Sequence, residues 1–105
     1  MKLMTKELEK KLSKYPFGSQ EEAGDNALVL AKYFGGCTYT ALVTEAEKQE
    51  DGDWLFFGIV TLDGSFWEWG YFCLSEIEQL RFPPFRLPAE RDLYISAGTK
   101  VSDIV

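Results

Sequence analysis

The chain of 105 residues contains no histidine and only two cysteines. Histidine is the commonest general base and the commonest metal ligand, so its absence removes most catalytic and metal-binding arrangements. Cys37 and Cys73 are far apart in the sequence, and without histidine they are typical of reduced thiols rather than of a disulfide scaffold or a zinc site. We therefore expect no catalytic residue, no cofactor and no metal.

Long apolar runs are also absent. No segment approaches the roughly 18 apolar residues of a membrane-spanning helix, and the N-terminus lacks the apolar stretch of a secretory signal. No phosphate-binding glycine pattern follows a strand, so Gly35-Gly36 predicts a turn and not a nucleotide site. The sequence predicts a cytoplasmic protein that forms a single domain over residues 1–105, without membrane association.

Positive charge is scarce in the long middle part of the chain. Residues 15–80 carry twelve acids against two lysines, whereas residues 1–14 carry five lysines against two acids. Nucleic-acid binding needs a basic surface that neutralises phosphates, so we do not expect direct binding to nucleic acid. An acidic surface instead attracts a protein partner that has a basic groove.

Eight acidic and aromatic residues are candidates for binding such a partner. The acids cluster between residues 45 and 53 and lack the ligand spacing of a calcium loop, so we expect them to be solvated. A small domain cannot bury all of its aromatic side chains, and exposed ones would anchor a partner. The predicted partner-binding residues are Glu45, Glu47, Glu50, Asp51, Asp53, Trp54, Trp67 and Trp69.

The N-terminal residues predict a short amphipathic helix. Leu8, Leu12 and Tyr15 recur at helical spacing after Thr5, which is a suitable N-cap. The proline and glycine of residues 16–18 end this helix, and the polar stretch Ser19–Asn26 that follows indicates a connecting loop.

Four apolar or β-branched segments then predict an antiparallel meander. Gly35-Gly36 and Asp63-Gly64 have the composition of two-residue hairpin turns, and a charged loop, Ala46–Asp53, joins the middle pair of strands. The predicted strands are Ala27–Phe34, Cys37–Glu45, Trp54–Leu62 and Ser65–Leu74.

The C-terminal third predicts a second helix and an edge strand. Ser75 and Glu78 have the spacing of a capping box, and the helix that they begin must end before Pro83-Pro84. Asp92–Ile95 predicts a short edge strand. The predicted fold is therefore α+β, an antiparallel four- to five-stranded meander sheet with a short N-terminal helix and a second short helix after the fourth strand.

Both faces of the third strand are apolar, with Trp54 and Phe56 on one face and Leu55 and Phe57 on the other. Such a strand is either covered on both sides by its own chain or covered on one side by a partner, and the pattern is compatible with both. An exposed apolar sheet face would favour a homodimer.

Two charged sets are compatible with chemistry or with structure. Glu45 and Glu68 lie near strand ends and could act as an acid and base pair, but solvated or salt-bridged glutamates are the favoured interpretation. Glu90-Arg91-Asp92 offers a guanidinium fork to a carboxylate ligand, although pinning of the last strand is favoured.

The chain resembles the family called domain of unknown function 2958 over residues 3 to about 95. The resemblance rests on four segments that fall in the right order, namely Met4–Leu8, Phe56–Gly58, Gly70–Ile77 and Glu90–Leu93. It implies a small acidic bacterial protein of the kind carried by plasmids, phages and conjugative elements. The family supplies no catalytic residues that could be transferred to this chain.

These observations lead to two main hypotheses. The first is a non-enzymatic inhibitor of a bacterial nucleic-acid-targeting defence nuclease, for example an anti-CRISPR protein whose acidic surface competes for the basic channel of a CRISPR effector. The second is an accessory interaction protein of plasmid or conjugative-element maintenance that binds through an aromatic sheet face. An enzyme that uses paired carboxylates is a third and less favoured hypothesis.

Overall fold

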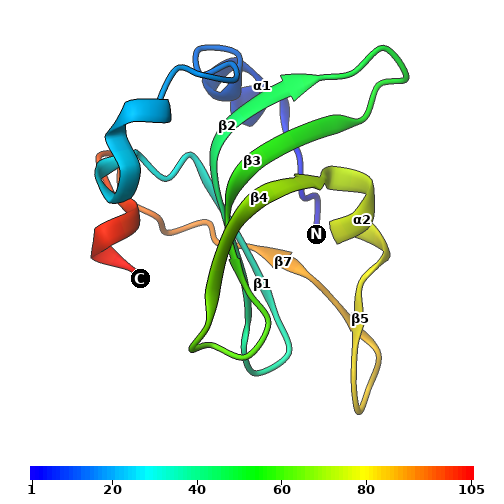
Figure 1. Cartoon of the computed structure of the whole chain (residues 1–105). Helices are drawn as coiled ribbons and strands as arrows, with labels where there is room; N and C mark the ends of the chain where they lie inside the picture. Colours follow the sequence, from blue (N-terminus) through cyan, green and yellow to red (C-terminus); the bar gives the residue numbers. More distant parts are fainter.

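An antiparallel sheet of five strands organises the computed structural model of the chain, which describes residues 1–105. The strands lie side by side in the order β4-β3-β2-β1-β7, so the first four form the predicted meander (Figure 1). The predicted α+β fold is confirmed. The strands are β1 (Ala31–Gly35), β2 (Tyr39–Lys48), β3 (Trp54–Thr61), β4 (Trp67–Cys73) and the two-residue β7 (Glu90–Arg91).

The two predicted helices are present. In α1 (Lys6–Leu12), the Thr5 hydroxyl caps the helix by accepting a hydrogen bond from the Leu8 amide at 3.1 Å. This helix ends at Leu12, before Tyr15. The second helix, α2 (Leu74–Gln79), follows β4 directly. No helix of the structure has the length and apolar character needed to cross a membrane.

The predicted capping box of α2 is wrong by two residues. The carboxylate of Glu76, not Glu78, accepts a hydrogen bond from the backbone amide of Cys73 at 3.3 Å. Cys73 therefore occupies the N-cap position, and the helix begins at Leu74. Ser75 lies inside the first turn, where its side chain is free to bind elsewhere.

Strand ends differ from the prediction where distant segments compete for backbone groups. Residues 27–29 lie outside β1 because they pair with the C-terminal segment: the Val29 amide donates to the Thr99 carbonyl at 2.8 Å, and the Val101 amide donates to the Ala27 carbonyl at 3.0 Å. The last sheet strand is Glu90–Arg91 and not Asp92–Ile95, so that prediction is wrong. A small hairpin, β5 (Arg81–Phe82) with β6 (Leu87–Pro88), precedes it.

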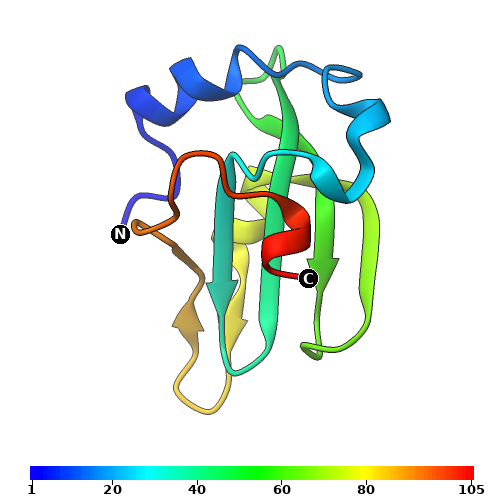
Figure 2. The ribbon, with the colours of Figure 1, turned by 90° about the vertical axis from the view of Figure 1, so that its left-hand side faces the viewer.

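The chain covers the sheet on both faces. The first face, which carries Trp54 and Phe56, packs against α1, α2 and the N-terminal segment in the larger hydrophobic cluster. The second face carries Ile59, which packs with Val101 in a smaller cluster beneath the 3-10 helices η1 (Glu21–Asn26) and η2 (Val101–Asp103). Figure 2 shows these two short helices on one side of the sheet. They cover only part of the second face, and the part beside β4 stays open.

Candidate functional site

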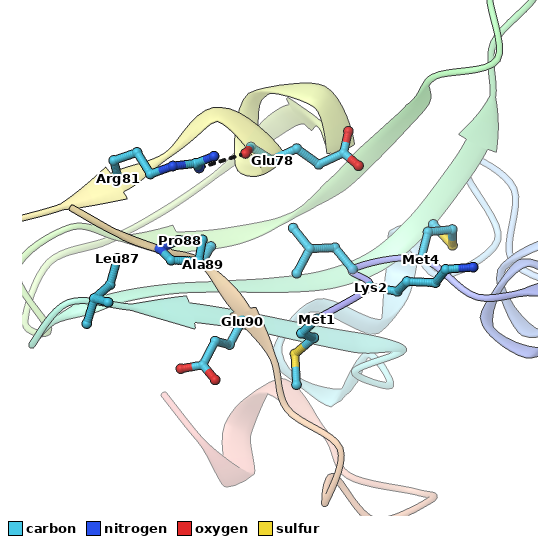
Figure 3. Close-up of a pocket in the computed structure, with 10 residues that line it drawn as sticks. Met1, Lys2, Met4, Glu78, Arg81, Leu87, Pro88, Ala89 and Glu90 are labelled. Carbon is cyan, nitrogen blue, oxygen red and sulfur yellow. Dashed lines mark hydrogen bonds between the residues drawn. The ribbon is translucent and has the colours of Figure 1, made fainter. Parts of the chain in front are cut away.

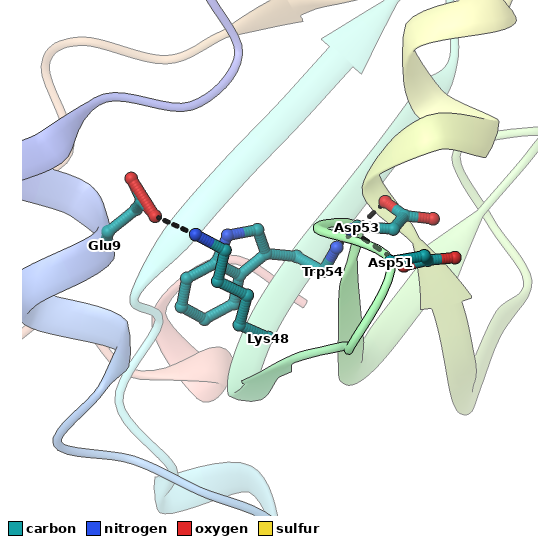
Figure 4. A network of polar contacts seen from close by, with 5 residues as sticks. All are labelled: Glu9, Lys48, Asp51, Asp53 and Trp54. Atoms are coloured by element: carbon teal, nitrogen blue, oxygen red, sulfur yellow. Dashed lines mark hydrogen bonds and ion pairs between the residues drawn. The ribbon is translucent and has the colours of Figure 1, made fainter.

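Asp53 is tied to the backbone at the start of β3 and α2. Its Oδ1 accepts hydrogen bonds from the amides of Trp54 at 2.8 Å (Figure 4) and Ser75 at 3.1 Å, and its Oδ2 accepts one from the Ser75 hydroxyl at 2.6 Å. The Ser75 hydroxyl and the two amides favour the charged carboxylate and hold the pKa of Asp53 below its usual range. Asp53 therefore joins α2 to the β2–β3 hairpin and is not a freely solvated acid.

The other acids of this hairpin are exposed. Asp51 accepts a hydrogen bond from the Asp53 amide at 2.9 Å, which shapes the turn, and Glu50 makes no hydrogen bond. The Glu47 Oε2 accepts one from the Phe17 amide at 3.1 Å. Nearby, Lys48 forms an ion pair with Glu9 of α1 at 3.5 Å (Figure 4). Glu47, Glu50 and Asp51 thus remain available to a partner.

The three predicted tryptophan anchors have different environments. Trp54 is only 5% exposed and lies in the larger core cluster, so it belongs to the interior and not to a binding surface. Trp67 is half-buried against the smaller cluster. Trp69 is 40% exposed on β4, and of the three it is the one that a partner reaches most easily.

Glu45 is buried because a β-bulge in β2 shifts the register and places its side chain on the second face of the sheet. The register of β2 against β3 shifts between Val43 and Glu45, so Thr44 is the extra residue. Glu45 then lies opposite Phe57 on the second face and accepts hydrogen bonds from the amides of Gly18 at 3.0 Å and Gln20 at 2.8 Å. The prediction that Glu45 is a solvated acid is wrong, since Glu45 is only 5% exposed.

Gln20 holds the segment before η1 against the same bulge. Its side-chain amide donates to the carbonyls of Thr44 at 2.7 Å and Leu28 at 3.0 Å, and its side-chain oxygen accepts from the Leu28 amide at 2.7 Å. These three bonds use both amide protons and one oxygen lone pair of Gln20. The segment is therefore fixed over one end of the second face.

Four aromatic rings form a continuous row on this face. Phe57 stacks on Trp69 with ring centroids 5.8 Å apart and contacts Tyr71 at 5.0 Å, and Phe17 meets Tyr71 edge to face at 5.4 Å. We call Phe17, Phe57, Trp69 and Tyr71 the aromatic row. Tyr71 is 64% exposed, so the row is open to solvent along β4.

A cavity of about 460 Å³ lies between the aromatic row and the η1 segment. We call it the η1 cavity. Its volume is within the range of roughly 300–1,000 Å³ that is usual for ligand sites. It is lined by all four rings of the aromatic row, by the carboxylates Glu45 and Glu21, and by Gly18, Gln20, Gly24 and Thr44.

Sequence reasoning missed three of the four rings. The alternation in β4 places positions 67, 69 and 71 on one face, so Tyr71 was predictable from the same pattern as Trp69. Phe57 was assigned to an apolar face but not to a site. Phe17 comes from the turn after α1, and nothing local in the sequence indicates that it reaches β4.

A second cavity, of about 680 Å³, lies between the N-terminal segment, α2 and the β5–β6 hairpin (Figure 3). The guanidinium of Arg81, which lines this cavity, donates to the carbonyls of Glu78 at 3.0 Å and Leu80 at 2.7 Å. The guanidinium therefore satisfies carbonyls at the end of α2. The remaining walls mix methionine, proline and isolated charges without a convergent set of polar groups.

The charged sets considered for chemistry are not assembled as an active site. Glu45 lies opposite Phe57, and Glu68 lies opposite Val60, so the two glutamates are on opposite faces of the sheet. Both cysteines are free thiols, and burial, followed by the Glu76 carboxylate, raises the pKa of Cys73. No group of three potential ligands is arranged to hold a metal ion.

The triplet Glu90-Arg91-Asp92 has a structural role. Glu90 and Arg91 form β7, the Arg91 guanidinium donates to the Lys2 carbonyl at 3.5 Å, and Asp92 pairs with Lys32 at 3.6 Å. These contacts pin the last strand to β1 and to the N-terminal segment, which was the favoured interpretation.

Comparison with known proteins gives one family. The family described as a protein of unknown function, DUF2958, matches residues 3–105, which is essentially the whole chain. Neither the curated proteins nor the solved structures contain a match.

Proposed function

The chain belongs to the DUF2958 family, and since that family carries no assigned activity, we propose from the site itself that the protein is a non-enzymatic, cytoplasmic inhibitor that binds a basic protein. The proposed partner is a bacterial nucleic-acid-targeting defence nuclease, such as a CRISPR effector. The acidic surface would compete for the basic channel that holds nucleic acid.

The observation that carries this proposal is an exposed aromatic row beside unpaired acids. Trp69 and Tyr71 are exposed, and aromatic anchors of this kind supply most of the energy in many protein interfaces. Glu47 lies on the same face, and the exposed Glu50 and Asp51 lie in the adjoining β2–β3 turn. The whole chain has a net charge of −6, which also favours a basic partner.

The test uses a panel of purified defence nucleases and measures DNA cleavage with and without the protein at low and high salt. We expect inhibition of at least one nuclease, weakened by salt because exposed charges are screened. The double variant Glu50→Gln/Asp51→Asn should weaken inhibition roughly tenfold, which corresponds to about 1.4 kcal/mol. The control Glu78→Gln/Glu90→Gln removes the same charge at exposed residues beside the second cavity and should leave inhibition intact. Absence of inhibition across the panel contradicts the proposal.

A second candidate is an accessory interaction protein of plasmid or conjugative-element maintenance. It is favoured by the structural use of Glu45 and Asp53, which leaves the aromatic row as the larger free feature. In this case Trp69→Ala should abolish binding to a partner from the same element, while Glu50→Gln/Asp51→Asn should have little effect. A homodimer through the same face stays a prediction.

A further inference from the structure

Glu45 is a buried carboxylate that has no cationic partner. It accepts hydrogen bonds from two backbone amides, and neither of the two ion pairs of the chain involves it. Buried carboxylates in proteins are normally paired with a cation or coordinate a metal. Because Glu45 also lines the η1 cavity, the missing partner would have space beside it.

The free acceptor sites of Glu45 match a guanidinium. A carboxylate offers about four lone-pair sites, two on each oxygen. The Gly18 amide uses one site on Oε1 and the Gln20 amide uses one on Oε2, which leaves one site on each oxygen. Two parallel N–H groups of a guanidinium need one acceptor on each carboxylate oxygen, whereas an ammonium group acts as a point charge.

The walls of the cavity match the flat faces of the same group. The faces of aromatic rings carry negative potential and attract cations, and a guanidinium stacks on them more readily than a strongly hydrated ammonium. Phe57 and Trp69 are within 20° of parallel, and Tyr71 and Phe17 continue the row. The walls of the cavity thus combine aromatic surface with the Glu45 carboxylate, which lies beside Phe57 on the same face of the sheet.

A second acid strengthens the preference for positive charge. Glu21 of η1 lines the same cavity and is exposed at the surface, and no lysine or arginine lines it. The volume of about 460 Å³ is larger than one side chain needs, so part of the adjoining peptide backbone can enter as well. These features favour a residue of a protein segment.

We propose that the η1 cavity binds an arginine side chain of a partner protein, with the guanidinium paired to Glu45 and stacked on the aromatic row. This inference rests on the proposed function, since it names the group of the basic partner that the surface recognises. The general negative charge of the protein attracts any basic partner, and the η1 cavity would give the interaction its specificity for arginine.

The test uses three short peptides that differ at one position, N-acetyl glycyl-X-glycine amide with arginine, citrulline or lysine as X. Citrulline has nearly the shape of arginine but no charge. Each peptide is titrated into the ¹⁵N-labelled protein while the indole N–H resonances of the three tryptophans are followed. We expect the arginine peptide to shift Trp69 saturably, with at least tenfold weaker binding of citrulline and lysine. Trp54, which is buried in the other cluster, should not shift.

Variants assign the binding to the cavity. Glu45→Gln should weaken the arginine peptide at least tenfold, and Tyr71→Ala should weaken it severalfold. If Glu45→Gln fails to fold because one of the Gly18 and Gln20 amides then faces an NH₂ group instead of an acceptor, Tyr71→Ala on the edge strand still tests the proposal. The matched control is Tyr94→Ala, which removes an aromatic ring that is 90% exposed outside the cavity and should leave binding unchanged.

Equal binding of arginine and citrulline, equal binding of arginine and lysine, or no saturable shift of Trp69 would overturn the proposal. The peptide result is independent of any nuclease. Arginine binding without nuclease inhibition would support the η1 cavity as an arginine site and contradict the nuclease as its partner. Nuclease inhibition without arginine binding would support the proposed partner and contradict the arginine site.

Discussion

Acids that are neighbours in the sequence have different physical roles at the scale of single residues. Glu45 and Asp53 each accept several hydrogen bonds from backbone or hydroxyl donors, whereas Glu50 accepts none and is exposed. Charge is visible in a sequence, but the donors that surround a carboxylate come from segments far away in the chain. The acidic cluster was therefore predictable as a cluster and not as a set of separate roles.

Two glycines that pair across β3 and β4 give the first stability prediction. A Cβ atom on Gly58 would lie 1.8 Å from the carbonyl oxygen of Leu42, whereas a Cβ atom on Gly70 would meet nothing within 4 Å. Gly58→Ala should therefore destabilise the fold by about 3 kcal/mol or more, because the obstruction is backbone. Gly70→Ala, the matched control, should be neutral or stabilising by about 0.4–1 kcal/mol.

Urea unfolding of both variants, followed by tryptophan fluorescence, measures this difference. A loss below about 1 kcal/mol for Gly58→Ala would mean that β2 and β3 separate easily at the bulge, and the described position of Glu45 would then be wrong.

At the scale of elements, local patterns predicted the helices and hairpins, and distant pairing changed their ends. The cap at Thr5 depends on adjacent residues and was predictable. Asp63-Gly64 does lie between β3 and β4, but the prediction of a two-residue turn is wrong, because Thr61 pairs with Trp67 and residues 62–66 form the connection. The start of β1 was not predictable, because residues 27–29 bind a C-terminal segment about seventy positions away. The bulge at Thr44 likewise depends on Gln20, which the sequence places in an unpatterned loop.

The junction of α2 with the β2–β3 hairpin gives a prediction with a defined pH dependence. The pKa of Asp53 is lowered in the folded state, so its stabilising contribution is present above the unfolded pKa, near pH 4, and is lost as the pH falls through the folded value. Asp53→Asn should destabilise the protein by about 1 kcal/mol at pH 7, because the hydrogen bonds from Trp54 and Ser75 then go to a neutral side chain with one oxygen instead of two.

Thermal unfolding between pH 2 and pH 7 checks this junction. The difference in free energy of unfolding between the wild type and Asp53→Asn should shrink at the acid end. Glu50→Gln is the control, since Glu50 is exposed and makes no hydrogen bond, and it should match the wild type throughout. A constant difference for Asp53→Asn at every pH would show that the charge of Asp53 is not what stabilises the junction.

At the scale of the whole molecule, the sequence was compatible with a sheet covered on both faces by its own chain or with one face left for a partner, and the structure has features of both. The chain covers most of the first face with its larger cluster, although Glu68 on β4 stays exposed there, and it covers only part of the second face with η1 and η2. The open remainder carries the aromatic row. Composition indicated that some aromatic residues stay outside, but the identity of those residues depends on how η1 folds over the sheet.

The measurement that tests the central claim most directly is the hydrogen-exchange footprint of the protein mixed with each nuclease of the panel. The account predicts slower amide exchange over residues 17–24 and β4 in the complex, because these segments border the aromatic row and the η1 cavity. Exchange in the β5–β6 hairpin and around the second cavity, which lies between this hairpin, α2 and the N-terminal segment, should not change. Protection confined to that hairpin, or no protection with any nuclease, would contradict the claim that the second face of the sheet binds a basic partner.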